Sequence, residues 1–304
     1  MLNVISGLLD VKTVIPPVSF TTDYLVVAGG ASGAGDNVGN GGGGGAGGLR
    51  CTVTATGGGG SLESALTLDT ATNYTVTIGA GGASRTSGSQ QNGAVGNDSI
   101  FSTITSAGGA GGGYLMQTGL NGGSGGGAGQ RGGGGTNGGT GTANQGYRGG
   151  NIPALSNNFY SGAGGGGAGA TGEDMGNVDN GTKGGNGVAT SITGSSVTYA
   201  GGGGGSNHSI VNNPALNAGG TGGGGGGKNQ TTAGVNGTAN LGAGGGAGGE
   251  SYASGAGGSG VVILRYPDTR TITFGAGVTG TESSASGGYK RATITAGTGN
   301  VSWA

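Results

Sequence analysis

Few side chains in this sequence could carry catalysis. His208 is the single histidine and Cys51 the single cysteine, so neither a zinc site of several histidines nor a supported Cys-His dyad can be assembled. Cys51 lies in an alternating segment, residues 49–55, and is interpreted as a small buried hydrophobe. The twelve acidic residues are dispersed, whereas polysaccharide hydrolysis needs paired carboxylates in a cleft. We expect no catalytic residues and no enzyme activity.

Two local patterns could hold a ligand, and both fall short. Glu173, Asp174, Asn177 and Asp179 form an oxygen-rich segment, but their spacing is not that of an EF-hand, and a solvated loop is the favoured interpretation. In the stretch GGGGGGKN, Lys228 is followed by asparagine, which lacks the hydroxyl that binds magnesium in a phosphate-binding loop. We therefore expect no metal site and no cofactor.

The strongest candidates for a binding role are large side chains isolated among glycines. Aromatic residues and arginine dominate recognition hot spots, and loops on rigid scaffolds often carry function. An equally weighted alternative is that Ile152, Leu155 and Phe159 pack as a local plug over the glycine region. The predicted receptor-binding residues are Tyr114, Met116, Tyr147, Arg148, Phe159, Tyr160, His208 and Tyr252.

Composition limits the partners. Ninety of 304 residues are glycine, 8% are charged, and the net charge is −1. Scattered basic residues argue against nucleic acid, whose phosphates require clustered Lys and Arg. No apolar run of about eighteen residues is present, so membrane insertion is not expected. Residues 1–17 lack a basic stretch before their apolar residues and do not resemble a secretory signal.

The glycines predict an ordered scaffold rather than a flexible linker. Low charge and recurring Val, Ile and Thr argue against disorder, and the glycine runs return to apolar strands at Val188, Val197 and Val261. Collagen is excluded because the glycines lack a strict period of three residues. Extended polyglycine-II segments can bond to neighbours on several sides if no Cβ intervenes, and we expect Ala, Ser, Thr and Asn only on outer faces. At about 3.1 Å per residue, a run of about eight to ten residues spans roughly 25–31 Å.

The sequence predicts a mainly β protein with a polyglycine-II bundle and essentially no α-helix. Expected strands include 24–28, 49–55, 74–78, 99–105, 261–266, 271–274, 289–295 and 301–303. We divide the chain into an N-terminal attachment arm (1–22), a strand-rich domain (23–106), a glycine-rich region (107–258) and C-terminal strands (259–304). A hairpin near 187–200 is expected inside the glycine-rich region.

The order of several motifs resembles the glycine-rich virion proteins of tailed bacteriophages. DYLVVAGG at 23–30 and YTVTIGAGG at 74–82 are similar to two recurring motifs of that family. SIFSTITSAGG at 99–109, SITGSSVTYAGGGGG at 191–205 and GSGVVILRY at 258–266 resemble later ones. TAGTGNVSW at 295–303 resembles a short β module that often closes phage fibre proteins. The resemblance covers roughly residues 23–304.

The resemblance implies a tail-fibre or tail-tip adhesin whose loops touch the host receptor, a protein or a glycan. The arm would join other virion proteins, and the protein would reside in the virion. The strands at 23–105 and after 268 depart from small tip adhesins, and they favour a whole fibre or another appendage. The alternative is a purely structural subunit of a virion appendage or a self-assembling extracellular filament. A homo-oligomer such as a trimer is left open.

Overall fold

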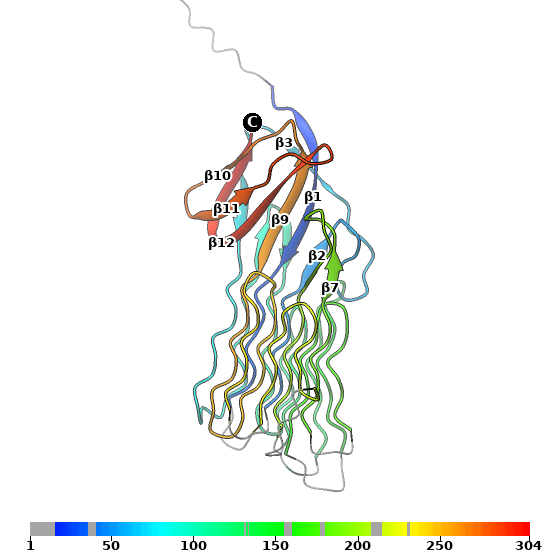
Figure 1. The fold of residues 1–304 in the computed structure, drawn as a ribbon, viewed down its shortest axis with the longest axis vertical. Coiled ribbons are helices and arrows are strands. Elements are labelled where there is room, and N and C mark those ends of the chain that lie inside the picture. The colour runs from blue at the N-terminus through cyan, green and yellow to red at the C-terminus, as the bar shows by residue number, and fades with distance from the viewer. Residues whose placement is uncertain are drawn as a thin grey trace, which may run out of the picture.

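The computed structural model describes residues 16–35, 41–130, 132, 134–154, 160–176, 180–207, 215–229 and 232–304. Within these residues the secondary structure is all β, with no helix, which confirms the predicted fold class. The strands gather at one end of the molecule, and long glycine runs extend from them toward turns at the other end (Figure 1). We call the strand end proximal and the opposite end of the glycine bundle distal.

The strands of the described residues form a ten-stranded sheet, curled into a nearly closed barrel, and a two-stranded hairpin. The order along the main path is β2-β1-β9-β12-β4-β5-β6. Strand β3 pairs with β1, and β10 and β11 pair with β12. The strands are β1 (Ser19–Val27), β2 (Leu49–Cys51), β3 (Leu66–Asp69), β4 (Tyr74–Thr77), β5 (Ser99–Phe101), β6 (Ile104–Ser106), β7 (Val188–Thr190), β8 (Val197–Tyr199), β9 (Val261–Pro267), β10 (Ile272–Phe274), β11 (Val278–Glu282) and β12 (Tyr289–Trp303).

Side chains near the two ends of the sheet path draw the barrel together. The Ser106 hydroxyl on β6 donates to the Val26 carbonyl on β1 at 2.8 Å. The Arg50 guanidinium on β2 also approaches the Thr105 carbonyl on β6, at 3.4 Å. These contacts cover strand edges that would otherwise present unpaired backbone groups.

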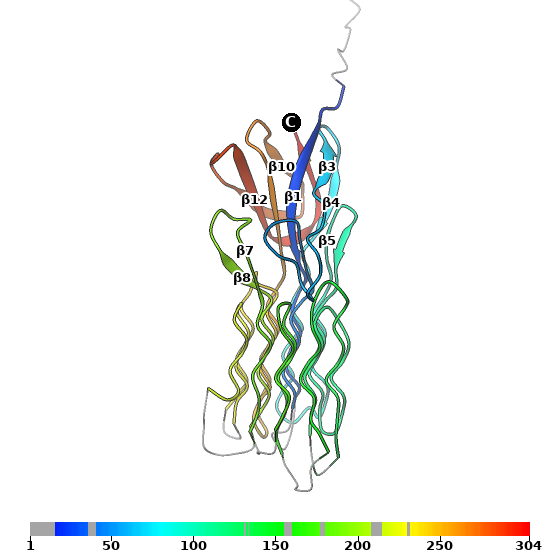
Figure 2. The same cartoon turned by 90° about the vertical axis from the view of Figure 1, so that its right-hand side faces the viewer.

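Strands β1 and β9 are buried on both faces, as their continuous apolar runs predict. Alternate residues point to opposite sides of a strand, so each strand supplies two cores. Tyr24 and Val26 face the barrel interior, whereas Leu25 and Val27 face the β7–β8 hairpin. Figure 2 shows that hairpin beside the barrel, at the top of the glycine bundle. The predicted hairpin near 187–200 is therefore present.

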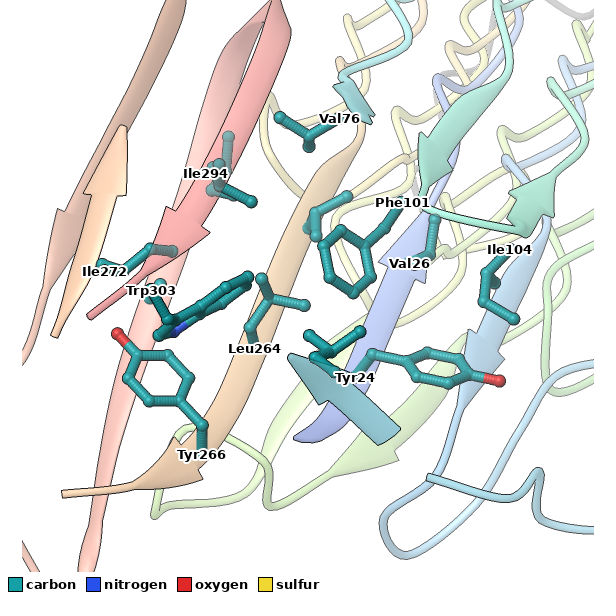
Figure 3. Packing of buried hydrophobic residues seen from close by; sticks show 14 of the residues in the cluster. Tyr24, Val26, Val76, Phe101, Ile104, Leu264, Tyr266, Ile272, Ile294 and Trp303 are labelled. Atoms are coloured by element: carbon teal, nitrogen blue, oxygen red, sulfur yellow. The ribbon is translucent and has the colours of Figure 1, made fainter. Parts of the chain in front are cut away.

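Trp303 anchors the barrel interior. Its ring packs edge-on against Phe20, Tyr74 and Tyr266 at centroid distances of 5.6, 5.9 and 5.5 Å, a favoured geometry for aromatic pairs. Figure 3 shows Trp303 and Tyr266 beside Ile272 and Leu264 in this core. The C-terminal strand is thus part of the central sheet rather than a separate appendage.

Several strand boundaries differ from the sequence prediction. The single strand expected at 99–105 is two strands, because Ser102 adopts a positive φ of 52° and reverses the chain. The two strands expected at 289–295 and 301–303 are one, β12. β3 and β11 were not predicted. Strand β1 begins at Ser19, inside the range assigned to the arm.

The glycine runs bond to their neighbours with a repeat of three residues. In the run 28–35, the N–H groups of Ala28, Ala31 and Ala34 donate to the run 41–48. The next residues, Gly29, Ser32 and Gly35, donate to 91–97, and Gly30 and Gly33 donate to 255–258. The carbonyls of residues 29–32 accept from three further runs, 78–85, 107–113 and 242–248. This run therefore has six bonded neighbours.

The runs 41–48 and 200–207 repeat this arrangement. Run 41–48 donates to 107–113, 160–168 and 242–248, and accepts from 28–35, 124–130 and 200–207. A threefold repeat of donors is what packed polyglycine-II segments require, since such a helix has about three residues per turn. The polyglycine-II conformation itself stays a prediction. The bundle also includes runs before residue 107, so it is not confined to the region 107–258.

The expectation that alanine and serine occupy only outer faces is wrong. Ala31, Ala46, Ala200, Ser32 and Ser206 are all fully buried within the runs. A methyl group fits on one run because the facing position on its neighbour is glycine. A Cβ added to Gly41 would lie 3.0 Å from the Cβ of Ala34, and one added to Gly122 would lie 3.0 Å from that of Ala110.

Replacing a central glycine by alanine should destabilise the bundle strongly. A Cβ on Gly203 would overlap the Gly245 carbonyl oxygen, so the two runs would have to separate and lose their hydrogen bonds. We expect Gly203→Ala to lower the free energy of unfolding by about 3 kcal/mol, at the upper end of overpacking costs. Thermal and urea unfolding would measure the change.

Gly226→Ala is the matched control, because the nearest atom to its added Cβ is the Asn217 carbonyl oxygen at 3.7 Å. It should be neutral or stabilise by about 0.5 kcal/mol through the unfolded chain. Equal effects of the two substitutions would contradict the packed-run interpretation.

Candidate binding surface at the distal end

A tight turn at the distal end carries Tyr114, Leu115 and Met116. The Gln117 N–H donates to the Tyr114 carbonyl at 2.8 Å and closes the turn. Leu115 and Met116 both have positive φ, 28° and 52°, the signs of a type I′ turn, which normally selects Asn or Gly at these positions. The Met116 side chain is 52% exposed, so an apolar group stands in solvent at a position where its backbone is strained.

Two neighbouring turns share this feature. One is the turn 249–252, which closes when the Tyr252 N–H donates to the Gly249 carbonyl at 3.1 Å. Tyr252 is 42% exposed. Ser251 in this turn has φ 57°, and Gln90 in the turn after residue 85 has φ 46°. Left-handed backbone costs a non-glycine residue on the order of 1 kcal/mol. A chain so rich in glycine nevertheless keeps side chains at these positions.

Arg85 and Asn92 connect the three turns. Arg85 exchanges two hydrogen bonds with Ser254, and its Nε donates to the Asn92 carbonyl at 2.8 Å. The Asn92 side-chain oxygen accepts from the Tyr114 N–H at 2.8 Å, and the Ser87 hydroxyl donates to the Ser251 carbonyl. We call the turns 85–92, 114–117 and 249–254 the distal turn cluster. Arg85 and Asn92 could not be predicted as members of this cluster, because only the fold brings 85–92 beside the other two turns.

The glycine runs that hold this cluster match a family model described as a glycine-rich domain over residues 9–267. The chain belongs to this glycine-rich domain family. The matched region ends with β9, so the family match leaves out β10, β11 and β12, although β12 pairs with β9 and β4 in the same sheet. A search of curated proteins found no match.

Tyr147 and Arg148 do not join the distal turn cluster of this glycine-rich domain. Tyr147 lies near the proximal end, where a Cβ on Gly59 would meet its hydroxyl. Arg148 lies on the flank of the bundle and forms two bonds to the Asp174 carboxylate, at 2.6 and 3.0 Å. The sequence analysis interprets the isolated large side chains as parts of loops. These two residues instead belong to a run, 146–152, that is bonded to 124–130 and 160–168.

The remaining predicted residues are placed only in part. Phe159, His208 and Leu155 lie outside the described residues, and Tyr160 is half-buried at the start of the run 160–168. Ile152 is 2% exposed and packs with Ala128, Ala163 and Met175, so this member of the alternative plug is buried inside the bundle. Of the predicted binding residues, Tyr114, Met116 and Tyr252 are the ones that the described structure brings together.

A hollow with a volume of about 580 Å³ lies where the barrel joins the bundle. Its charged groups compensate each other, since Arg50 donates to both oxygens of Glu63 at 2.7 and 2.6 Å. The Tyr24 hydroxyl donates to the same carboxylate at 2.6 Å, and burial together with this bond raises the pKa of Tyr24. The triad ties β1 and β2 to the loop that carries Glu63.

The described ranges hold no assembled metal site. No group of three or more His, Cys, Asp or Glu side chains in them could hold a metal ion. Burial raises the pKa of the Cys51 thiol, which opposes its use as a nucleophile. A helix that could cross a membrane is likewise not found among these residues.

The Arg148–Asp174 pair should contribute little to stability, and only above acidic pH. Its hydrogen bond from Arg148 lowers the pKa of Asp174 below its ordinary 3.8, so the contribution is present above that value and is lost as acid protonates the carboxylate. Because both side chains are more than one-third exposed, we expect Asp174→Asn to cost less than about 1 kcal/mol at pH 7. Thermal unfolding at pH 7 and pH 3 should show this difference shrinking in acid. If the stability difference between wild type and Asp174→Asn were as large at pH 3 as at pH 7, the ion-pair assignment would be contradicted.

Proposed function

We propose that this protein is a structural component of a tailed-bacteriophage virion, a tail fibre or tail-tip protein that binds the host surface without catalysis. The resemblance of its motifs to glycine-rich virion proteins supports this proposal. In the structure these motifs are the junctions where strands pass into glycine runs: β1 into 28–35, β4 into 78–85 and 253–260 into β9. The resemblance therefore follows the architecture rather than glycine content alone.

The observation that carries the proposal is the distal turn cluster. Each of its turns holds a non-glycine residue at positive φ, and the exposed Met116 and Tyr252 stand at its surface. Strained backbone persists where the surrounding structure holds it and often marks a functional site. Aromatic and apolar side chains on rigid supports suit a protein epitope or the faces of sugars.

The opposite end suits attachment to the virion. Residues 16–18 leave the barrel at its proximal end (Figure 1), where Pro16, Val18, Ala71 and Trp303 line an apolar hollow of about 460 Å³. In this proposal the arm joins other virion proteins, and the bundle spaces the receptor-binding turns from them. A purely structural subunit is the alternative, and the binding experiment below decides between the two.

Glycines at the strained turn should weaken binding to the host surface while preserving the fold. In the double variant Leu115→Gly/Met116→Gly, the exposed groups are lost and the positive φ values become favourable. We expect unchanged or higher stability, by about 1–2 kcal/mol for the two positions, and at least tenfold weaker binding of the purified chain to susceptible cells. Cell binding and competition with phage infection would be measured together.

Asn144→Gly is the matched control, because Asn144 also has positive φ, 60°, but lies in a turn beside the barrel. It should leave cell binding unchanged. If the double variant binds as well as the wild type, the distal turn cluster is not the recognition surface. If the wild-type chain binds no host cell and blocks no infection, the structural alternative replaces the proposal.

A further inference from the structure

An arginine on the side of the barrel, Arg291, has no acidic partner among the residues that the structure describes. Arg291 on β12 lies directly opposite Arg265 on β9 in the antiparallel register, so two positive side chains share one face of the sheet, an unfavourable arrangement by itself. Asp23 on β1 compensates Arg265, with its carboxylate 2.6 Å from the guanidinium. No carboxylate among the described residues pairs with Arg291.

A second acidic residue on this side of the barrel, Glu282, is occupied elsewhere. Glu282 on β11 stands opposite Ala292, and its carboxylate accepts from the Tyr266 hydroxyl at 2.7 Å and from the Ile272 N–H at 3.1 Å. Lys290 supplies its charge partner at 3.4 Å. Burial favours the neutral form of Glu282, but these contacts together outweigh it and lower the pKa of Glu282. They fix its charge away from Arg291.

The fold holds the Arg291 guanidinium in one orientation. Its Nε donates to the Ile192 carbonyl, at 2.9 Å, in the loop of the β7–β8 hairpin, which lies beside β12 in Figure 2. Gly194, with φ 98°, lies over the guanidinium, and a Cβ there would be 3.6 Å from Cζ. With Nε occupied, only the two terminal nitrogens remain to bind a ligand, and such a pair matches the two oxygens of a carboxylate.

Arg291 lines a hollow of about 440 Å³, a size within the range of small-molecule sites. Its other lining residues are small and either carry a hydroxyl or are glycine. They are Thr193, Gly194, Ser283, Ser284, Ser286 and Gly287. The hydroxyls of Ser284 and Ser286 make no hydrogen bond to another described side chain or backbone group. Hydroxyl groups of this kind match a polyhydroxylated ligand.

We propose that this hollow binds a carboxylate-bearing saccharide unit, with its carboxylate on the terminal nitrogens of Arg291 and its hydroxyls on Ser284 and Ser286. The site lies on the barrel flank and shares no residue with the distal turn cluster. It stands whether or not the distal turns bind a receptor. An acidic polysaccharide would thus meet the protein at a second, lateral place.

Isothermal titration of the purified full chain at low salt tests this assignment. We expect glucuronic acid to bind and glucose, which lacks the carboxylate, to bind at least tenfold more weakly. Arg291→Gln should reduce glucuronic acid binding at least tenfold. Arg148→Gln, which removes an arginine from the bundle flank, should leave it unchanged.

Inorganic phosphate separates the sources of the anion. If phosphate binds more tightly than glucuronic acid and depends on Arg291, the ligand is a phosphate and the carboxylate assignment is overturned. If glucuronic acid fails to bind, or binds equally to the Arg291→Gln variant while circular dichroism shows that variant folded, the site is rejected.

Discussion

Backbone hydrogen bonds between glycine runs are the constraint on which the rest of the structure depends. Each central run bonds to six others, and this packing brings backbones so close that a Cβ at most central glycines would overlap a neighbouring carbonyl. Glycine is the residue most costly to order, and the runs have almost no apolar side chains to bury. Their order must therefore come from satisfying nearly every N–H and C=O in a water-free interior, where an unpaired group is costly. A local change in one central run thus disturbs several others.

The barrel solves a problem that such runs cannot solve alone. A threefold donor repeat fixes which neighbours a run contacts, but one glycine looks like the next, so the runs carry little information about their relative shift. Strands β1 and β9 continue directly into runs 28–35 and 253–260, and their pairing, Val27 opposite Val261, sets the level of those runs. Buried side chains on both faces of these strands hold that register, because a slip of one residue would exchange the two faces. Buried alanines opposite glycines add local markers within the bundle.

The elements that depend on side-chain pattern could be predicted from the sequence. Apolar periodicity predicts three of them correctly, because their residue types alone indicate which positions are buried. These are the apolar run at 24–28, the hairpin near 187–200 and the strand at 261–266. Strand β3, strand β11 and the reversal at Ser102 could not be predicted, since tertiary pairing rather than local pattern creates them. The distal turn cluster could be predicted only in part. Tyr114, Met116 and Tyr252 are recognisable in the sequence as large side chains isolated among glycines. Arg85 and Asn92 are not, because their role depends on contacts with turns that are distant in the sequence. Tyr147 and Arg148 stood out equally, yet they lie in a run, because large side chains fit along the flank of the bundle as well as at its turns.

This packing also decides where the protein can carry function. Interior positions of the runs are mostly glycine, alanine or serine, so a large recognition side chain at most of them would separate the backbones. The turns and the barrel surface are free of that restriction. They hold the exposed apolar groups Met116 and Tyr252 and the charge of Arg291, which pairs with no carboxylate of the described residues. The turns tolerate backbone strain because the runs on both sides of each turn are held by hydrogen bonds to several neighbouring runs. A side chain at Leu115 or Met116 with positive φ costs on the order of 1 kcal/mol, which is small beside the many backbone bonds that hold the ends of its turn in place.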